Sequence, residues 1–223
     1  MQDFPFAIVG FDLDGTFIDT SGDLTAAVNH ALATAGRPPL TREQVVPMIG
    51  GGARHMLKLG MTATGGWDDA ELDRLHPLLL DHYAANIAIL SRPFPGAMAA
   101  LDELDALGVK VAIVTNKLES LALGLLGELG IADRFACVIG GDTMGPGRSK
   151  PDRAPIDAMI ERCGGGAAAF VGDSVFDIQA ARNAGIPSVA VSFGFLMQPV
   201  AELHADAVID RYADLVPTLR TLG

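Results

Sequence analysis

Residues 9–20 of this 223-residue chain read VGFDLDGTFIDT, an apolar run that ends in acid. Ile8 to Phe11 have the composition of a buried strand, and Asp12 and Asp14 follow directly, before a break at Gly15. Positions two apart on an extended backbone point to the same side, so both carboxylates leave the strand end together. Like charges this close repel unless a cation, a proton or a reacting group compensates them. The stretch therefore predicts a core strand with a reactive or ion-binding end.

The rest of the chain alternates short β-branched runs with longer helical patterns. Six strands are expected, within residues 6–11, 109–116, 136–141, 168–174, 188–194 and 206–210. Helix-like stretches lie between them, at residues 97–108, 119–130, 154–164 and 177–185. This alternation predicts parallel βαβ units, and hence an α/β fold with an open, doubly wound, mainly parallel sheet covered on both faces.

One interval breaks the alternation. From about residue 19 to residue 90 the pattern is helical throughout, with no convincing strand. A crossover between parallel strands does not need that much chain. We interpret residues 19–90 as an inserted all-helical domain, and residues 1–18 and 91–223 as the α/β core, with Pro93 and Pro95 marking the return.

Composition and charge narrow the range of partners. Hydrophobic residues make up 49% of the chain and charged residues 19%, which favours a folded globular protein. The net charge of −11 argues against nucleic acid or an anionic membrane surface as a partner. We find no signal peptide, no apolar stretch long enough to span a membrane and no metal-ligand spacing around Cys137 and Cys163. A soluble cytoplasmic protein is expected, as a monomer or a homodimer.

Polar residues gather where four of the predicted strands end. Ligands of open α/β sheets bind at the carboxyl ends of the strands. The residues at or after those ends are Asp12, Asp14, Gly15 and Thr16; Thr115, Asn116 and Lys117; Ser149, Lys150 and Pro151; and Gly172, Asp173, Ser174 and Asp177. Each one alone has a simpler interpretation, as a helix cap or a solvated charge. Together they supply the carboxylates, donors and cation that metal-assisted phosphoryl transfer requires.

These motifs, in this order, resemble those of the haloacid dehalogenase-like superfamily of phosphohydrolases. They stand here as DLDGT from Asp12, TN from Thr115, KP from Lys150 and GDSVFD from Gly172, and the resemblance covers nearly the whole chain. The helical insertion resembles the cap domain that some members carry directly after the first motif. The fold implied is a Rossmann-like core with a helical cap.

The resemblance also implies roles for the site residues. Asp12 would be the nucleophile that forms an aspartyl-phosphate, and Asp14 the general acid and then the general base. Thr115, Asn116 and Lys150 would bind the transferring phosphoryl oxygens. Mg²⁺ would be held by Asp12, the Asp14 backbone carbonyl and Asp173. Asp177, beside Ser174, would lie behind these ligands and orient Lys150 or a metal-bound water.

Within the superfamily the cap opening is similar to that of phosphoglycolate phosphatases and their near relatives. The loop of Gly50, Gly51 and Gly52 would let the backbone approach a ligand closely, and Arg54 could pair with a small carboxylate. A flexible turn with a solvated arginine is the alternative for this loop. The expected activity is Mg²⁺-dependent hydrolysis of a small phosphorylated metabolite, best matched by phosphoglycolate.

Other functions stay open at this point. Asp14 favours ester hydrolysis over dehalogenation, because a dehalogenase has no leaving alcohol to protonate. A phosphatase for another small or sugar phosphate and a phosphosugar mutase share the same motifs. A phospho-acceptor receiver domain fits less well, since it predicts neither the helical insertion nor Asp14. A purely binding relative would need a lost nucleophile or lysine, and a dinucleotide-binding enzyme would need G-x-G-x-x-G after the first strand.

Overall fold

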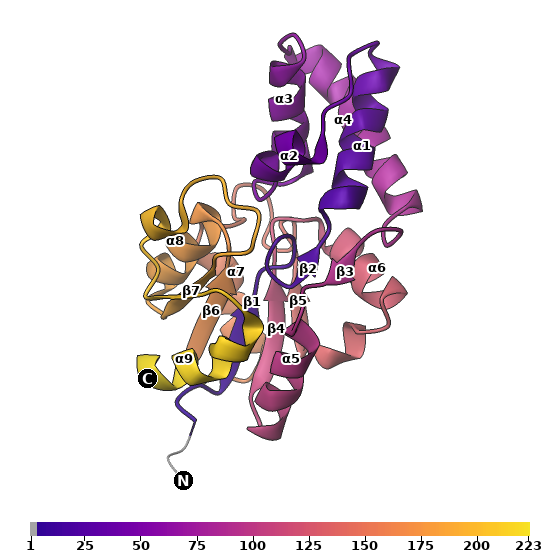
Figure 1. Ribbon diagram of the computed structural model, residues 1–223. Coiled ribbons are helices and arrows are strands. Elements are labelled where there is room, and N and C mark those ends of the chain that lie inside the picture. The colour runs from indigo at the N-terminus through magenta and orange to yellow at the C-terminus, as the bar shows by residue number, and fades with distance from the viewer. Residues whose placement is uncertain (1–3) are drawn as a thin grey trace.

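The computed structural model describes residues 4–223 and shows one parallel six-stranded sheet with helices on both faces (Figure 1). The order across the sheet is β5-β4-β1-β6-β7-β8. Its strands are β1 (Ile8–Phe11), β4 (Lys110–Val114), β5 (Cys137–Ile139), β6 (Ala168–Gly172), β7 (Ser188–Val191) and β8 (Ala207–Ile209). All six runs predicted to be strands form this sheet, and the predicted α/β fold class is confirmed.

Helices cover the two faces of the sheet as a doubly wound fold requires. The core helices are α5 (Ala97–Ala106), α6 (Glu119–Glu128), α7 (Ala154–Arg162), α8 (Val175–Ala184) and α9 (Leu215–Leu222). Alternate residues of β1 pack into two hydrophobic clusters, Val9 into the cluster that holds α5 and α9, and Ile8 into the one that holds α7 and α8. Strand β1 is therefore buried on both sides, which explains its continuous apolar sequence.

Gly10 lets α7 approach the middle of the sheet closely. A Cβ atom on Gly10 would lie 2.3 Å from the sulfur of Met159, well inside contact distance. The strand keeps a glycine at its centre because the neighbouring helix occupies the space of a side chain. This packing fixes β1, and so the acids that follow it, against the core.

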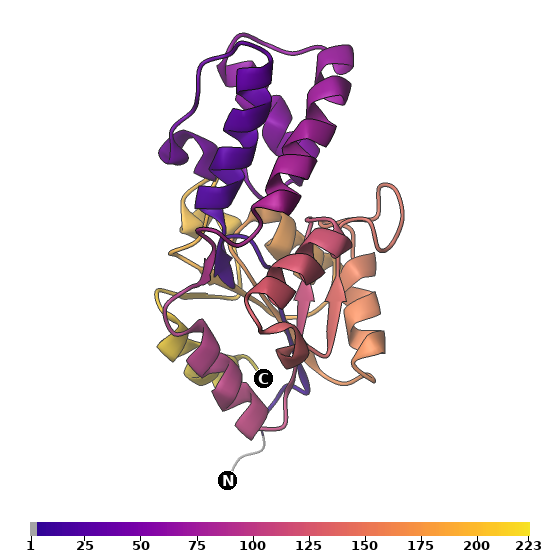
Figure 2. The ribbon, with the colours of Figure 1, turned by 90° about the vertical axis from the view of Figure 1, so that its right-hand side faces the viewer.

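Residues 21–85 hold four α-helices, a short 3-10 helix at Val46–Met48 and, among the described residues, no strand. The α-helices are α1 (Ser21–Thr34), α2 (Arg42–Val45), α3 (Ala53–Ala63) and α4 (Asp69–Ala85). Leu24, Val28 and Leu32 recur along one face of α1 and are buried against α4 and α3. Figure 2 shows these helices above the end of the sheet toward which the strand arrows point. The exact division into a core of 1–18 and 91–223 and a cap of 19–90 stays a prediction.

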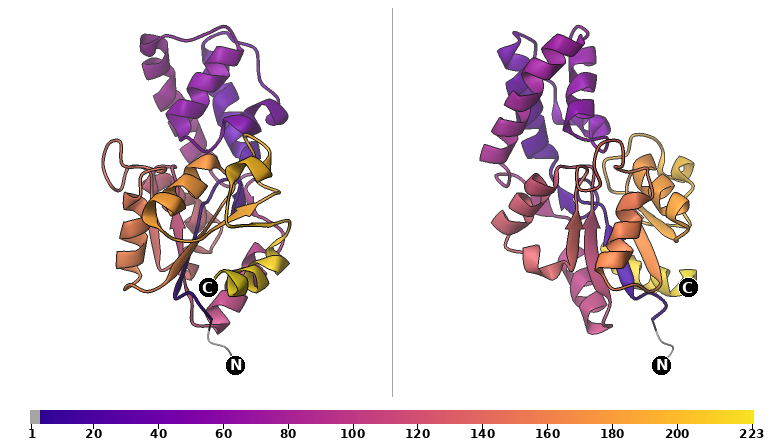
Figure 3. Two further views of the ribbon diagram at one scale, coloured as in Figure 1. Left: turned by 90° about the vertical axis from the view of Figure 1, so that its left-hand side faces the viewer. Right: turned by 180° about the vertical axis from the view of Figure 1, so that it is seen from behind.

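Two contacts fix the place where the chain leaves and re-enters the core. The short strands β2 (Ile18–Asp19) and β3 (Arg92–Pro93) pair antiparallel, which the sequence did not suggest. The buried carboxylate of Asp23 accepts hydrogen bonds from the backbone N–H groups of Leu90 and Ser91. Helix α9 and the start of the described chain lie at the far end of the core, away from the helical insertion (Figure 3).

Candidate active site

Lys150 occupies the centre of a buried charge cluster at the carboxyl edge of the sheet. Its Nζ donates to Asp12 Oδ1 at 2.6 Å, to Asp177 Oδ1 at 2.5 Å and to the carbonyl of Val114 at 2.7 Å. Burial alone would lower the pKa of Lys150, but the carboxylates of Asp12 and Asp177 outweigh burial and raise it. The two carboxylates therefore favour the charged form of the lysine, and three acceptors fix the direction of its ammonium group.

Three carboxylates meet around this lysine. One oxygen each of Asp12, Asp173 and Asp177 lies within 4.8 Å of the others. Asp173 is oriented by Thr16 Oγ1, which donates at 3.0 Å, and by the backbone N–H of Phe195, at 2.5 Å. The sequence placed Thr16 at a strand end but gave it no individual role, and it did not predict that the loop after β7 serves the site. Their roles need the folded chain, because 157 residues separate Thr16 from Asp173.

The first turn of α8 fixes Asp177. Its Oδ2 accepts from the backbone N–H of Ser174 at 2.9 Å and from the Ser174 hydroxyl at 2.5 Å. This is the reciprocal contact between the start of a helix and its third residue. Since Oδ1 of the same carboxylate binds Lys150, Asp177 joins the helix start to the lysine.

Asp14 pairs with Lys117, whereas Asp12 pairs with Lys150. Asp14 Oδ1 and Oδ2 accept from Lys117 Nζ at 2.7 and 2.8 Å, and Oδ1 also accepts from Thr20 Oγ1 at 2.7 Å. Burial opposes the charge of Lys117, yet the Asp14 carboxylate raises the pKa of Lys117 above its ordinary value. The sequence placed Lys117 at a strand end but gave it no role. Its position directly after Thr115 and Asn116 was the feature of the sequence that could have indicated a role in the site.

Thr115 and Asn116 follow β4 at the same edge. The Thr115 hydroxyl accepts from the backbone N–H of Lys117 at 3.2 Å. Asn116 Nδ2 lies 3.0 Å from the Gly50 carbonyl and 3.1 Å from the Lys150 carbonyl, so it joins the cap loop to the loop of the lysine. The buried Asn116 Oδ1 has no hydrogen-bond partner within residues 4–223. A contact of either residue with a phosphoryl oxygen stays a prediction.

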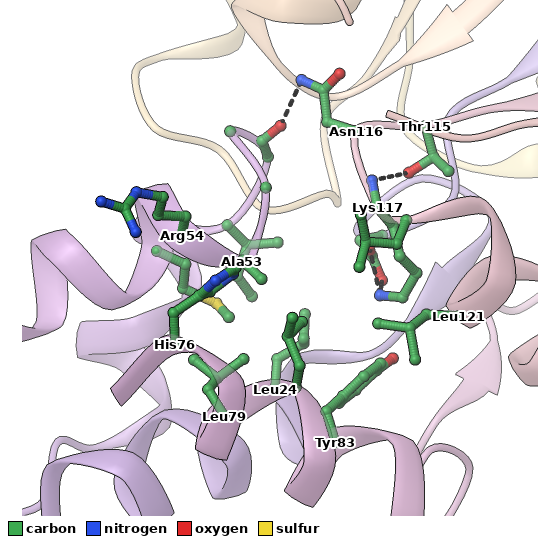
Figure 4. A pocket seen from close by; sticks show the side chains of 18 of the residues that line it. Leu24, Ala53, Arg54, His76, Leu79, Tyr83, Thr115, Asn116, Lys117 and Leu121 are labelled. Carbon is green, nitrogen blue, oxygen red and sulfur yellow. Dashed lines mark hydrogen bonds and ion pairs between the residues drawn. The ribbon is translucent and has the colours of Figure 1, made fainter. Parts of the chain in front are cut away.

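A cavity of about 200 Å³ opens between this edge and the helical insertion. Figure 4 shows Thr115, Asn116 and Lys117 along its core side, and Leu24, Leu79 and Tyr83 along the helical side. Both Asp12 and Asp14 line it, as does the loop of Gly50, Gly51 and Gly52. The acids thus face a space that is largely closed by apolar side chains.

Arg54 also lines the cavity, but its guanidinium group points away from it (Figure 4). Its Nη1 lies 2.6 Å from Asp73 Oδ1, in an ion pair whose side chains are 46% and 66% exposed. Ion pairs this open to water hold their partners weakly. The neighbouring His76 also lines the cavity, and burial and the charge of Arg54 lower its pKa.

Similarity to known proteins agrees with this geometry. A family model described as haloacid dehalogenase-like hydrolase matches residues 9–191. The chain belongs to this family. It is 42% identical to a phosphoglycolate phosphatase of Agrobacterium fabrum over 96% of this chain and 92% of that protein. A phosphoglycolate phosphatase of Caulobacter vibrioides is 41% identical, over 100% of this chain and 94% of that protein.

A comparison with solved structures finds the same fold in a protein described as a predicted phosphoglycolate phosphatase. A crystal structure of a predicted phosphoglycolate phosphatase from Haemophilus somnus 129pt superposes with a TM-score of 0.88 at 29% identity, over 96% of this chain and 98% of that one. The chain is thus a haloacid dehalogenase-like hydrolase in sequence and in fold, and the predicted recognition and enzyme class are confirmed. Within residues 4–223 no helix has the length and apolar character of a membrane span.

The acidic cluster of this haloacid dehalogenase-like hydrolase fits a divalent cation. Three carboxylates lie together and one ammonium group binds two of them, Asp12 and Asp177, so the cluster carries an excess of negative charge. Burial and the neighbouring acids raise the pKa of Asp12 to about 7 and raise that of Asp173 well above its usual range. Each shift reports an unfavourable ionised form that a cation would relieve. Oxygen donors at this spacing suit a hard divalent cation.

Gly194 supplies a test of how tightly Asp173 is held. A Cβ atom there would lie 2.3 Å from the Cβ of Asp173 and 2.6 Å from the Gly15 carbonyl oxygen. We expect Gly194→Ala to lower the free energy of unfolding by about 1–3 kcal/mol, the usual cost of overpacking, and to weaken Mg²⁺ binding. Urea denaturation and a Mg²⁺ titration measure the two effects.

Gly127→Ala in α6 is the matched control, because nothing lies within 4 Å of its added Cβ atom. It should leave Mg²⁺ binding unchanged and raise the free energy of unfolding by at most about 1 kcal/mol. Equal effects of the two substitutions would show that Asp173 can move freely.

Proposed function

We propose that this hydrolase cleaves a small phosphate monoester, with 2-phosphoglycolate as its substrate, through an aspartyl-phosphate on Asp12. The observation that carries the proposal is the state of Asp12. Lys150 binds its Oδ1, whereas its Oδ2 accepts no hydrogen bond from residues 4–223, and the residue lines the cavity. An oriented carboxylate with one free oxygen at a closed cavity is suited to attack phosphorus. The relatives named above support the substrate.

In the first step Asp12 Oδ2 would form a bond to phosphorus as the bond from phosphorus to the leaving oxygen breaks. Asp14, two residues further on, would give a proton to that oxygen, so that the product leaves as a neutral alcohol. The paired lysines neutralise both carboxylates in the resting site, Lys150 for Asp12 and Lys117 for Asp14. An ionised Asp14 has no proton to give, so it must leave Lys117 and take up a proton from solvent before it donates, and the second step returns that proton to it.

In the second step Asp14 would take a proton from a water molecule that attacks phosphorus, and the bond from phosphorus to Asp12 breaks. Phosphate leaves, and Asp12 is regenerated as a carboxylate. Lys150 and the donors of Thr115 and Asn116 would stabilise the charge that spreads over the phosphoryl oxygens. Leucine side chains form part of the cavity wall and would limit the access of water during the first step.

Mg²⁺ bound at Asp12 and Asp173 would add positive charge beside the transferring group, which is its general contribution to phosphoryl transfer. The Thr16 hydroxyl and the backbone N–H of Phe195 orient Asp173, and both groups lie far from it in the sequence. Asp177 orients Lys150, which in turn holds Asp12. This protein framework holds the acids in place before the cation arrives.

The test is phosphate release from a panel of esters, with and without Mg²⁺. We expect kcat/KM for 2-phosphoglycolate to exceed that for hexose phosphates by about 100-fold or more, because the apolar wall offers few partners to sugar hydroxyls. Removal of Mg²⁺ by chelation should abolish turnover of every ester. A hexose phosphate that exceeds 2-phosphoglycolate would refute the substrate, and transfer of phosphate between sugar positions without release would indicate a mutase.

A further inference from the structure

Lys117 is the most buried cation that faces the cavity. Its side chain is 5% exposed, against 46% for Arg54. Its ammonium group also lies 4.5 Å from the centre of the Tyr83 ring. A desolvated ammonium group attracts an anion more strongly than one surrounded by water. Any second negative group on the substrate, beyond its phosphate, is therefore drawn to this corner of the cavity.

Tyr83 adds an unused donor beside this cation. Its hydroxyl is buried and has no hydrogen-bond partner within residues 4–223. Figure 4 shows the Tyr83 hydroxyl directed toward the side of the cavity where Lys117 and Leu121 lie. Burial raises the pKa of Tyr83 to about 12, so the hydroxyl keeps its proton and can donate. A buried donor without an acceptor is unfavourable unless a ligand supplies the acceptor.

We propose that Lys117 Nζ and the Tyr83 hydroxyl bind the carboxylate of the substrate, and that this carboxylate displaces Asp14 from Lys117. The inference rests on the proposed function and names the groups that select its substrate. Lys117 lies two residues after Thr115, a span of at most about 7 Å along the chain, which suits a short phosphate ester with a carboxylate at its other end. Arg54, turned outward to Asp73, takes no part in this binding.

The exchange of partners links recognition to the reaction. Lys117 holds both oxygens of Asp14 in the resting site. When the substrate carboxylate takes Lys117, Asp14 keeps only Thr20 and can turn toward the leaving oxygen. An ester without a carboxylate would leave Asp14 paired with Lys117. The carboxylate therefore raises kcat as well as lowering KM.

Binding to variants that cannot turn over tests this directly. In Asp12→Asn protein with Mg²⁺, calorimetry would give Kd for 2-phosphoglycolate and for ethyl phosphate, which carries a methyl group in place of the carboxylate. Adding Asp14→Asn removes the competitor for Lys117. As a result, we expect the Kd of 2-phosphoglycolate to fall about tenfold and the Kd of ethyl phosphate to change by less than about threefold.

Substituting the lysine should have the opposite effect. Adding Lys117→Met to Asp12→Asn is expected to raise the Kd of 2-phosphoglycolate by about 30-fold or more, and the Kd of ethyl phosphate by less than about threefold. Tyr83→Phe should weaken 2-phosphoglycolate alone, by about fivefold. Lys58→Met is the matched control, because Lys58 also lies over an aromatic ring, at 4.0 Å from the centre of Trp67, but outside this cavity.

The outcomes separate the inference from the proposed function. Equal weakening of both esters by Lys117→Met, or equal tightening of both by Asp14→Asn, would show that Lys117 only positions Asp14. A carboxylate-specific loss in Arg54→Met but not in Lys117→Met would place the carboxylate at Arg54. If Asp12→Asn protein shows no preference for 2-phosphoglycolate over ethyl phosphate, the proposed substrate fails, and the inference with it. The Asp14→Asn comparison decides even if Lys117→Met does not fold, because it leaves Lys117 in place.

Discussion

Asp12→Asn is expected to lower phosphate release by on the order of 10⁴-fold or more, the scale on which enzymes lose rate when a covalent nucleophile is removed. The amide nitrogen and oxygen of asparagine are poor nucleophiles, so no aspartyl-phosphate would form. The fold should survive, because Lys150 keeps Asp177 and the Val114 carbonyl as acceptors. Stability should even rise slightly, since Asp12 is an acid whose pKa burial has raised to about 7.

Initial rates of phosphate release and a thermal melt measure both effects. Asp133→Asn is the matched control, because it makes the same chemical change on the exposed side chain of a residue in the short helix Ala132–Arg134, outside the cavity. It should keep the full rate. A folded Asp12→Asn protein that retains a tenth of the wild-type rate would overturn the assignment of the nucleophile.

The position of the site followed from the sequence because parallel strands end at one edge. Asp12, Thr115 and Asp173 each come directly after an apolar run, and the sheet order β4-β1-β6 makes those three strands neighbours. Parallel pairing leaves no other way to arrange their ends. The helical character of residues 21–85 was equally readable, since buried leucines recur there at helical spacing.

The partners of each side chain could not be read in this way. Lys117 and Arg54 are both cations close to glycine-rich or polar loops, and the sequence offered Arg54 as a partner for the carboxylate, with a solvated arginine as the alternative. The structure turns Arg54 to Asp73 and Lys117 to Asp14. These directions depend on which acids the fold brings near, across 19 residues in one case and 103 in the other. Spacing within a motif carries no such information.

Lys150→Met is expected to lower the free energy of unfolding by about 3–5 kcal/mol, the usual cost of removing one member of a buried ion pair. Methionine keeps the length and volume of the stem, but it leaves Asp12 and Asp177 without their cation in a site that is almost closed to water. Phosphate release should also fall by about 100-fold or more, since Lys150 directs Asp12 and neutralises charge at phosphorus. Urea denaturation and initial rates would be measured on the same preparation.

Lys110→Met is the matched control, because Lys110 is an exposed lysine whose Nζ, among residues 4–223, binds only the Cys163 carbonyl, at 2.7 Å. This substitution should lower the free energy of unfolding by less than about 1 kcal/mol. A second change separates loss of the charge from loss of packing. In the wild-type background Asp177→Asn removes a partner of Lys150 and should destabilise. In the Lys150→Met background the same change removes an uncompensated negative charge and should stabilise. An identical effect of Asp177→Asn in both backgrounds would show that the two side chains are not coupled, and that the cluster is held together by packing alone.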